Sequence, residues 1–184
     1  MLKNAEYIYE NVIISDENNT TKQYCKKAQV GVDLSVKNIW MLGNVGVVTK
    51  DKTYVPVYLK AAKETKYYEH IGKEITGWFL PKGTYICELN EGAQFGDNDT
   101  GLIIMRSSLN RSGVTIQSAV WDPGFTTRDG EKVNTMNVRL TVDSNVGFFL
   151  EENSRVAQIL IFENEASSLY QGQFQNGSTV SKLV

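Results

Sequence analysis

The sequence contains few of the side chains on which metal and acid–base catalysis usually depend. Its 184 residues include one histidine, His70, and two cysteines, Cys25 and Cys87. A zinc-dependent nucleobase deaminase needs a His-x-Glu and a Cys-x-x-Cys motif, and neither occurs. A catalytic triad could use only the single imidazole, whose polar context is typical of a surface or turn residue. Because the cysteines are far apart in the chain, we expect them to be reduced and partly buried.

Excess charge of one sign and long apolar runs are also lacking. The 19 Lys and Arg residues nearly balance the 21 Asp and Glu residues, so the net charge is -2. This balance offers no general electrostatic surface for nucleic acid or an anionic membrane. Charged residues interrupt the N-terminal stretch, and no apolar run approaches the ~18 residues of a membrane helix. We expect a cytoplasmic protein, or one of the host cytoplasm if a virus encodes it, without nucleic-acid or membrane partners.

The chain has 3 prolines against 15 glycines, and its apolar residues come in short runs separated by turn residues. These runs are rich in Val, Ile, Thr, Tyr and Phe, and they occupy residues 30–36, 46–59, 77–89, 100–105, 114–121, 138–142 and 155–162. Many short strands at this spacing predict an all-β sandwich or barrel with only short helices. No repeat or linker divides the chain, so residues 1–184 are expected to form a single domain.

Two segments have the composition of helices. Residues 60–75 contain helix formers and charge pairs such as Glu69 with Lys73, although their apolar stripe is poor. Residues 106–113 (RSSLNRSG) contain serines able to cap a short helix and a glycine, Gly113, able to end it. We expect one or two helical turns at the second segment.

The same segment, 106–113, concentrates two arginines and two hydroxyl groups directly after an apolar strand. Arginine can grip phosphate oxygens bidentately, and the free N–H groups at a helix start would point the same way. The segment is therefore a candidate anion site, with a capped surface helix as the alternative. The nearby segment 96–101 (GDNDTG) spaces two aspartates as a calcium loop does, but Ser108 stands where a glutamate ligand belongs. A polar turn is the better interpretation of that segment.

Residues 119–125 (AVWDPGF) place Asp122 between a strand and a Pro-Gly turn. Trp121 and Phe125 flank the carboxylate. A carboxylate held by a rigid turn beside apolar rings can act as a general base on water. On its own, however, Asp-Pro-Gly indicates only a turn.

Taken in order, five motifs resemble those of the dUTPase and dCTP deaminase superfamily: VGVDL (30–34), RSSLNRSGV (106–114), AVWDPGF (119–125), ENSRVAQILIF (152–162) and YQGQFQ (170–175). The Asp-Pro-Gly form of the third motif is similar to the deaminase branch, which also includes dUTPases. The resemblance implies a dUTPase-like distorted jelly-roll, or β-clip barrel. It also implies a homotrimer with shared active sites and a C-terminal tail, about residues 165–184, that closes over the nucleotide.

The resemblance further implies roles for individual residues. Asp122 would be the catalytic base, and Asp33 would position Mg²⁺ through water. Phe125 would pack on the deoxyribose and leave no room for a 2′-hydroxyl. The residues that the resemblance assigns to substrate binding are Arg106, Ser107, Ser108, Arg111, Ser118, Trp121, Phe125, Gln158, Tyr170, Gln173 and Gln175.

The resemblance leaves two reactions to be separated. Deaminases of this family use a glutamate in the strand after the Asp-Pro-Gly hairpin, and Thr141 occupies that position here, between Arg139 and Asp143. Threonine cannot accept a proton at neutral pH, so we favour hydrolysis of dUTP to dUMP and pyrophosphate. If the strand is aligned with the family pattern in the wrong register, Asp143 could be the functional carboxylate. The alternative is therefore a dCTP deaminase or a bifunctional enzyme.

Two departures from the family pattern leave the substrate open. Gln173 stands where a lysine is usual, and residues 152–155 read Glu-Asn-Ser-Arg where Gly-Asp-Arg is commoner. A different deoxynucleotide, such as a modified pyrimidine, therefore remains a candidate. From another functional class, a non-catalytic trimeric binding or structural protein is the further alternative.

Overall fold

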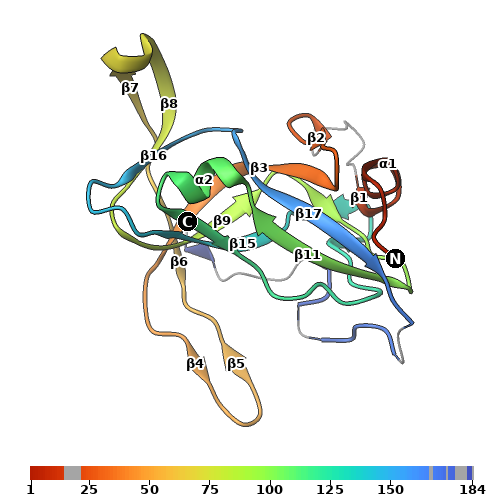
Figure 1. The fold of residues 1–184 in the computed structure, drawn as a ribbon. Helices are drawn as coiled ribbons and strands as arrows, with labels where there is room; N and C mark the ends of the chain where they lie inside the picture. The colour runs from red at the N-terminus through yellow and green to blue at the C-terminus, as the bar shows by residue number, and fades with distance from the viewer. Residues whose placement is uncertain (15–21, 166–167, 173, 177–181, 184) are drawn as a thin grey trace.

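The computed structural model describes residues 1–14, 22–165, 168–172, 174–176 and 182–183 (Figure 1). The helical elements are α1 (Ala5–Tyr7), the π-helical turn η1 (Ile8–Val12), the 3₁₀ turn η3 (Glu69–Ile71) and α2 (Ser107–Arg111). The strands are β1 (Ile13–Ile14), β2 (Lys26–Lys27), β3 (Val32–Leu42), β4 (Val47–Val48), β5 (Thr53–Tyr54), β6 (Tyr58–Lys60), β7 (Glu64–Tyr68), β8 (Lys73–Leu80), β9 (Gly83–Leu89), β10 (Gly92–Ala93), β11 (Asp99–Met105), β12 (Val114–Gln117), β13 (Arg128–Asp129), β14 (Lys132–Val133), β15 (Asn137–Val142), β16 (Phe148–Glu151), β17 (Arg155–Glu163) and β18 (Lys182–Leu183).

Six antiparallel strands close into a barrel. They follow the order β17–β11–β12–β15–β9–β3, and β3 pairs again with β17 to complete the ring. Closure leaves none of the six with a free edge. The predicted all-β class with short helices and a barrel is confirmed. Strands occur in every predicted strand region, although the stretch 118–121 contributes only an isolated bridge between Gly101 and Trp121.

The barrel core follows from the alternation of side chains along each strand. On β15, Val138, Leu140 and Val142 are buried, whereas Arg139 between them is exposed. Burying one such aliphatic side chain contributes roughly 1.5–3 kcal/mol. The opposite face of β15 is therefore free to carry polar groups, and it contributes to the pocket described below.

Two β-hairpins extend from the barrel, one formed by β4 and β5 and the other by β7 and β8 (Figure 1). The helical composition of residues 60–75 does not produce an α-helix, because this segment forms the end of β6, β7, η3 and the start of β8. Gly72 adopts φ of +64° at the turn, a left-handed conformation that ends the 3₁₀ segment. Across the hairpin the Thr65 and Thr76 hydroxyls lie 2.8 Å apart, and Tyr68 packs edge-on against Phe149. These tertiary contacts outweigh the local helix propensity.

Several smaller expectations are also settled by the structure. His70 is exposed on the turn η3, as predicted. Cys25 and Cys87 are both free thiols, the first half-buried and the second buried. The segment 96–101 is a polar turn, where Asp99 accepts a hydrogen bond from the Tyr7 hydroxyl at 2.8 Å. Within the described residues, no helix is both long and apolar enough to span a membrane.

Candidate active site

Four residues from three of the sequence motifs form one charged cluster, which we call the phosphate cluster: Asp33, Arg106, Arg155 and Gln158. The Asp33 carboxylate lies 3.2 Å from Arg106 Nε and 3.5 Å from Arg155 Nη1. Gln158 donates an amide hydrogen bond to Asp33 Oδ1 at 3.4 Å. Asp33 is buried, and its two cationic neighbours offset the cost of removing its charge from water.

Strand register explains why residues so distant in sequence meet at the phosphate cluster. Gln158 on β17 lies opposite Asp33 on β3 and, on its other side, opposite Ile104 on β11. Arg106 directly follows β11, and its guanidinium donates to the Arg155 carbonyl at 3.1 Å. The β3–β17 pairing shifts between Arg155 and Ala157, which brings Arg155 toward Asp33.

The helix α2 continues from the phosphate cluster and carries the remaining residues of the second motif. Ser107, Ser108 and Arg111 are all exposed on it. The predicted short helix is confirmed, but the serines that could have capped it do not do so. Arg106 occupies the N-cap position and makes no side-chain capping bond. The serine hydroxyls therefore remain available to a ligand on the exposed side of the helix.

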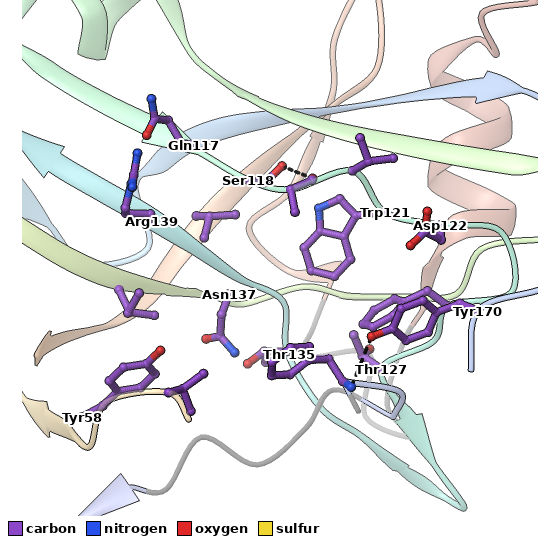
Figure 2. A pocket seen from close by; sticks show the side chains of 17 residues that line it. Tyr58, Gln117, Ser118, Trp121, Asp122, Thr127, Thr135, Asn137, Arg139 and Tyr170 are labelled. Atoms are coloured by element: carbon purple, nitrogen blue, oxygen red, sulfur yellow. Dashed lines mark hydrogen bonds between the residues drawn. The ribbon is translucent and has the colours of Figure 1, made fainter. Parts of the chain in front are cut away.

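A pocket of about 800 Å³ lies on another part of the barrel wall (Figure 2). It is lined by Val55, Tyr58, Ile86, Gln117, Ser118, Ala119, Val120, Trp121, Asp122, Phe125, Thr127, Thr135, Asn137, Val138, Arg139, Tyr170 and Phe174. The third motif thus supplies one wall, and β15 supplies the other. Burial raises the pKa of Tyr58, so its hydroxyl remains neutral at physiological pH.

An aromatic cluster fixes the third-motif wall. The ring of Phe125 packs edge-on against Trp121 at 4.9 Å and against Tyr170 at 5.5 Å between centroids. Phe95 lies behind them, stacked on Trp121. Phe125 is only 7% exposed, so its position is set by packing before any ligand arrives.

The C-terminal segment packs on the Pro-Gly turn of the third motif. The Tyr170 N–H donates to the Pro123 carbonyl at 2.9 Å, and the Gln175 side chain donates to the Gly124 carbonyl at 3.0 Å. Gly124 has φ of +76°, as this turn requires. Tyr170 and Phe174 line the pocket, whereas Gln173 lies outside the described residues. The predicted tail therefore borders the pocket through those of its residues that the structure describes.

Asp122 is exposed and is the one carboxylate among the residues that line the pocket. Thr141, at the position of the deaminase glutamate, shares the face of β15 that carries Asn137 and Arg139, but it does not line the pocket. Asp143 lies beyond the end of β15 and also outside the pocket. The pocket therefore has a carboxylate beside the third motif, and no carboxylate lines it from β15.

The phosphate cluster and the pocket lie apart on the barrel. The bridge between Trp121 and Gly101 places the third motif five residues along β11 from Arg106. At the usual rise of a strand, this corresponds to about 17 Å. None of the phosphate-cluster residues lines the pocket.

The donor set at the phosphate cluster limits which metal it could hold. Among the described residues, no three His, Cys, Asp or Glu side chains gather in a way that could bind a metal ion. Asp33 is the one carboxylate of the phosphate cluster, and within the described residues its Oδ1 accepts a hydrogen bond only from the Gln158 amide. Mg²⁺ commonly binds through one or two carboxylates, water and substrate phosphates. The residues therefore fit a Mg²⁺ ion that is held through water and arrives with a phosphorylated ligand.

Sequence reasoning missed Arg155, Arg139 and Asn137 as site residues. Arg155 had appeared only as part of a departure from the fourth motif. The alternation along β15 indicates that Arg139 and Asn137 leave the core, but it does not show that their face borders a pocket. The phosphate-cluster positions of Asp33, Arg106 and Gln158 agree with their grouping by the resemblance, while their roles remain predictions.

The geometry can be compared with that of known proteins. A family model described as dCTP deaminase-like matches residues 5–164. A probable deoxyuridine 5′-triphosphate nucleotidohydrolase of Methanosarcina acetivorans is 32% identical over 152 residues, which cover 81% of this chain and 80% of that protein. A relative of the same name from Aeropyrum pernix is 32% identical over 147 residues, 79% of this chain and 82% of that protein.

Among solved structures, a 2′-deoxycytidine 5′-triphosphate deaminase from Agrobacterium tumefaciens matches with a TM-score of 0.45 and 14% identity, over 81% of this chain and 41% of that chain. The family model spans most of the sequence, including four of the five motifs from Asp33 to Gln158. The resemblance inferred from the motifs is confirmed: the chain belongs to the dCTP deaminase-like family.

Proposed function

We propose that the protein hydrolyses dUTP to dUMP and pyrophosphate in a homotrimer. The observation that carries this proposal is the pocket, in which Asp122 is the one lining carboxylate and β15 presents no glutamate. This arrangement supplies a carboxylate base beside the third motif but no carboxylate on the β15 wall, the strand in which the deaminases carry their glutamate. The archaeal relatives named deoxyuridine 5′-triphosphate nucleotidohydrolases support the same reaction.

The pocket holds the nucleoside, and the third motif orients it. The backbone of residues 114–125, with Ser118 and Trp121, binds the pyrimidine, and Phe125 packs on the deoxyribose. Tyr170 and Gln175, in the described part of the tail, cover the nucleotide. Because Phe125 is fixed by its aromatic neighbours, a 2′-hydroxyl meets a wall that cannot move aside at low cost.

The triphosphate is bound by the phosphate cluster and α2 of the neighbouring subunit. Arg106, Arg155 and Arg111 neutralise its oxygens, and Gln158 and the hydroxyls of Ser107 and Ser108 donate hydrogen bonds. Asp33 would hold, through water, a Mg²⁺ ion that arrives with the substrate, and such an ion would supply positive charge to the phosphates. The separation of about 17 Å along β11 within one subunit supports this sharing of the site.

Asp122 accepts a proton from a water molecule that attacks the α-phosphorus. A bond forms between the water oxygen and that phosphorus, and the bond to the bridging oxygen of the β-phosphate breaks. The electron pair leaves with pyrophosphate, and dUMP remains. General-base catalysis of this kind contributes about 10²–10⁴-fold, while positioning and charge neutralisation supply most of the rest.

The deciding experiment is to incubate the purified protein with dUTP and, separately, with dCTP in Mg²⁺, and to separate the products by ion-exchange chromatography. Formation of dUMP and pyrophosphate from dUTP is expected, with dCTP unchanged. Appearance of dUTP or dUMP from dCTP would instead support a deaminase or a bifunctional enzyme. If neither nucleotide is converted but both bind, a non-catalytic binding protein becomes the better explanation.

A further inference from the structure

Arg139 is a cation in the pocket wall that has no side-chain partner among the residues the structure describes. It lies on the face of β15 that turns away from the core, between the buried Val138 and Leu140. Its cross-strand neighbours are Gln117 on β12 and Ile86 on β9, and both of these also line the pocket. No hydrogen bond or ion pair engages the Arg139 side chain within the described part of the chain, whereas Arg106 and Arg155 both pair with Asp33.

Arg139 lies at the end of the pocket opposite Asp122. Figure 2 shows Asp122 and Tyr170 at one end, Gln117 and Arg139 at the other, and Asn137 between them. If deoxyribose packs on Phe125 beside Asp122, as the proposed function requires, the pyrimidine ring extends toward Arg139. The ring atom farthest from the sugar is C4, which is opposite the glycosidic nitrogen. The exocyclic group on C4 is therefore the part of the base that approaches Arg139.

The chemistry of that exocyclic group separates uracil from cytosine. Uracil carries a carbonyl oxygen at C4, which only accepts hydrogen bonds, whereas cytosine carries an amino group, which donates them. A guanidinium has five N–H donors and no acceptor. Gln117 offers both a donor and an acceptor, so it can satisfy either base. The Tyr58 hydroxyl, on the same side of the pocket, also both donates and accepts, so among these three polar groups Arg139 alone distinguishes uracil from cytosine.

We propose that Arg139 determines the preference for uracil over cytosine by donating a hydrogen bond to O4 of the base. This inference rests on the proposed function for the orientation of the nucleotide and adds the residue that selects its base. A cytosine in the same position would set its amino group against a donor-only cation and leave a polar contact unmade. An unmade polar contact of this kind lowers the binding affinity far more than the loss of an apolar contact does.

The test measures equilibrium binding of the α,β-imido analogues of dUTP and dCTP by isothermal titration calorimetry in Mg²⁺. The two analogues carry the same triphosphate group, so the ratio of their affinities reports the contribution of the pyrimidine alone. Wild-type protein is expected to prefer the uracil analogue, and Arg139→Ala is expected to reduce that preference at least about tenfold. Arg139→Lys keeps a charged N–H donor but places it differently from a guanidinium, so it should retain part of the preference for uracil.

Arg128→Ala is the matched control, because Arg128 is an exposed arginine outside the pocket, and it should keep the wild-type ratio. An unchanged ratio in Arg139→Ala, or a wild-type protein without preference for uracil, overturns the inference. The readout does not need turnover. A protein that prefers the uracil analogue through Arg139 but hydrolyses no dUTP would refute the proposed function and leave this inference standing.

Discussion

Ser35 donates hydrogen bonds from its backbone N–H and from its hydroxyl to the buried carboxylate of Glu91. Its backbone N–H lies 3.1 and 3.0 Å from the two Glu91 oxygens, and its hydroxyl lies 2.7 Å from Oε1. Glu91 is completely buried, and burial raises its pKa to about 7 despite these hydrogen bonds, which lower it. Ser35 follows Asp33 by two residues and lies opposite Arg155 on β17. A carboxyl group that titrates near neutral pH therefore supports the strand that carries the phosphate cluster.

The first prediction concerns stability and pH. The Glu91 pKa is about 7 in the folded protein and near the ordinary 4.5 in the unfolded chain. Between these values the folded state binds the additional proton, so the contribution of Glu91 to the free energy of unfolding is fully present below pH 4.5. It is lost as pH rises through 7. The loss is on the order of 3 kcal/mol.

Urea unfolding of wild type and Glu91→Gln from pH 4.5 to 8 checks this. Other titrating groups act in both proteins, so the difference between them reports Glu91. Wild type should lose stability relative to the Gln variant as pH rises, while Glu74→Gln, an exposed control on β8, should follow wild type. A difference that stays constant with pH, or that changes in the opposite direction, contradicts the prediction.

A second prediction tests the catalytic base. Asp122→Asn removes the proton acceptor but keeps the size of the side chain, so turnover of dUTP should fall at least about 100-fold while binding of the imido analogue persists. The matched control is Asp143→Asn, since Asp143 lies beyond β15 and outside the pocket. Unchanged turnover in Asp122→Asn would remove this residue from the mechanism, and loss of turnover in Asp143→Asn would show that the deaminase register had been misread.

A third prediction concerns the sugar. Phe125→Ala should raise the ratio of kcat/KM for UTP to that for dUTP, because it opens space where the 2′-hydroxyl would lie. The same change removes a ring packed against Trp121 and Tyr170, and loss of a core phenylalanine costs about 3–5 kcal/mol of stability. The ratio is therefore measured at low temperature on protein shown to be folded. Phe149→Ala, which deletes an aromatic ring outside the pocket, should leave the ratio unchanged.

The fold was predictable where strand alternation and turn residues agree with the tertiary structure. The runs at 138–142 and 155–162 contain β-branched residues at buried positions, and both are barrel strands. Residues 60–75 have a helix-like composition because Ala61, Ala62 and the charged residues that follow favour a helix locally. Pairing with the following strand, and the packing of Tyr68 on Phe149, decided otherwise.

The site was predictable only in parts. Motif order indicated that Arg106 and Gln158 act together, but their meeting at Asp33 depends on the register of three strands, which no local pattern specifies. Arg139 was visible only as a charged residue in an alternating strand. Its placement in a pocket depends on residues 55–58 and on the third motif, which are far from it in sequence.

The last prediction tests whether the site is shared between subunits. Arg106→Ala removes a phosphate ligand and Asp122→Asn removes the base, so each variant alone should be nearly inactive. If every site takes Asp122 from one subunit and Arg106 from the next, random mixing of the two variants in a cyclic trimer restores about one quarter of the sites, because each contribution is intact with a probability of one half. Co-expression of the two variants, followed by purification of the trimer and measurement of dUTP turnover, provides the test. Two copies of a single variant, co-expressed in the same way, give the baseline. Activity that stays at this baseline in a mixed trimer would show that each subunit holds a complete site, and a monomeric mass in solution would contradict sharing directly.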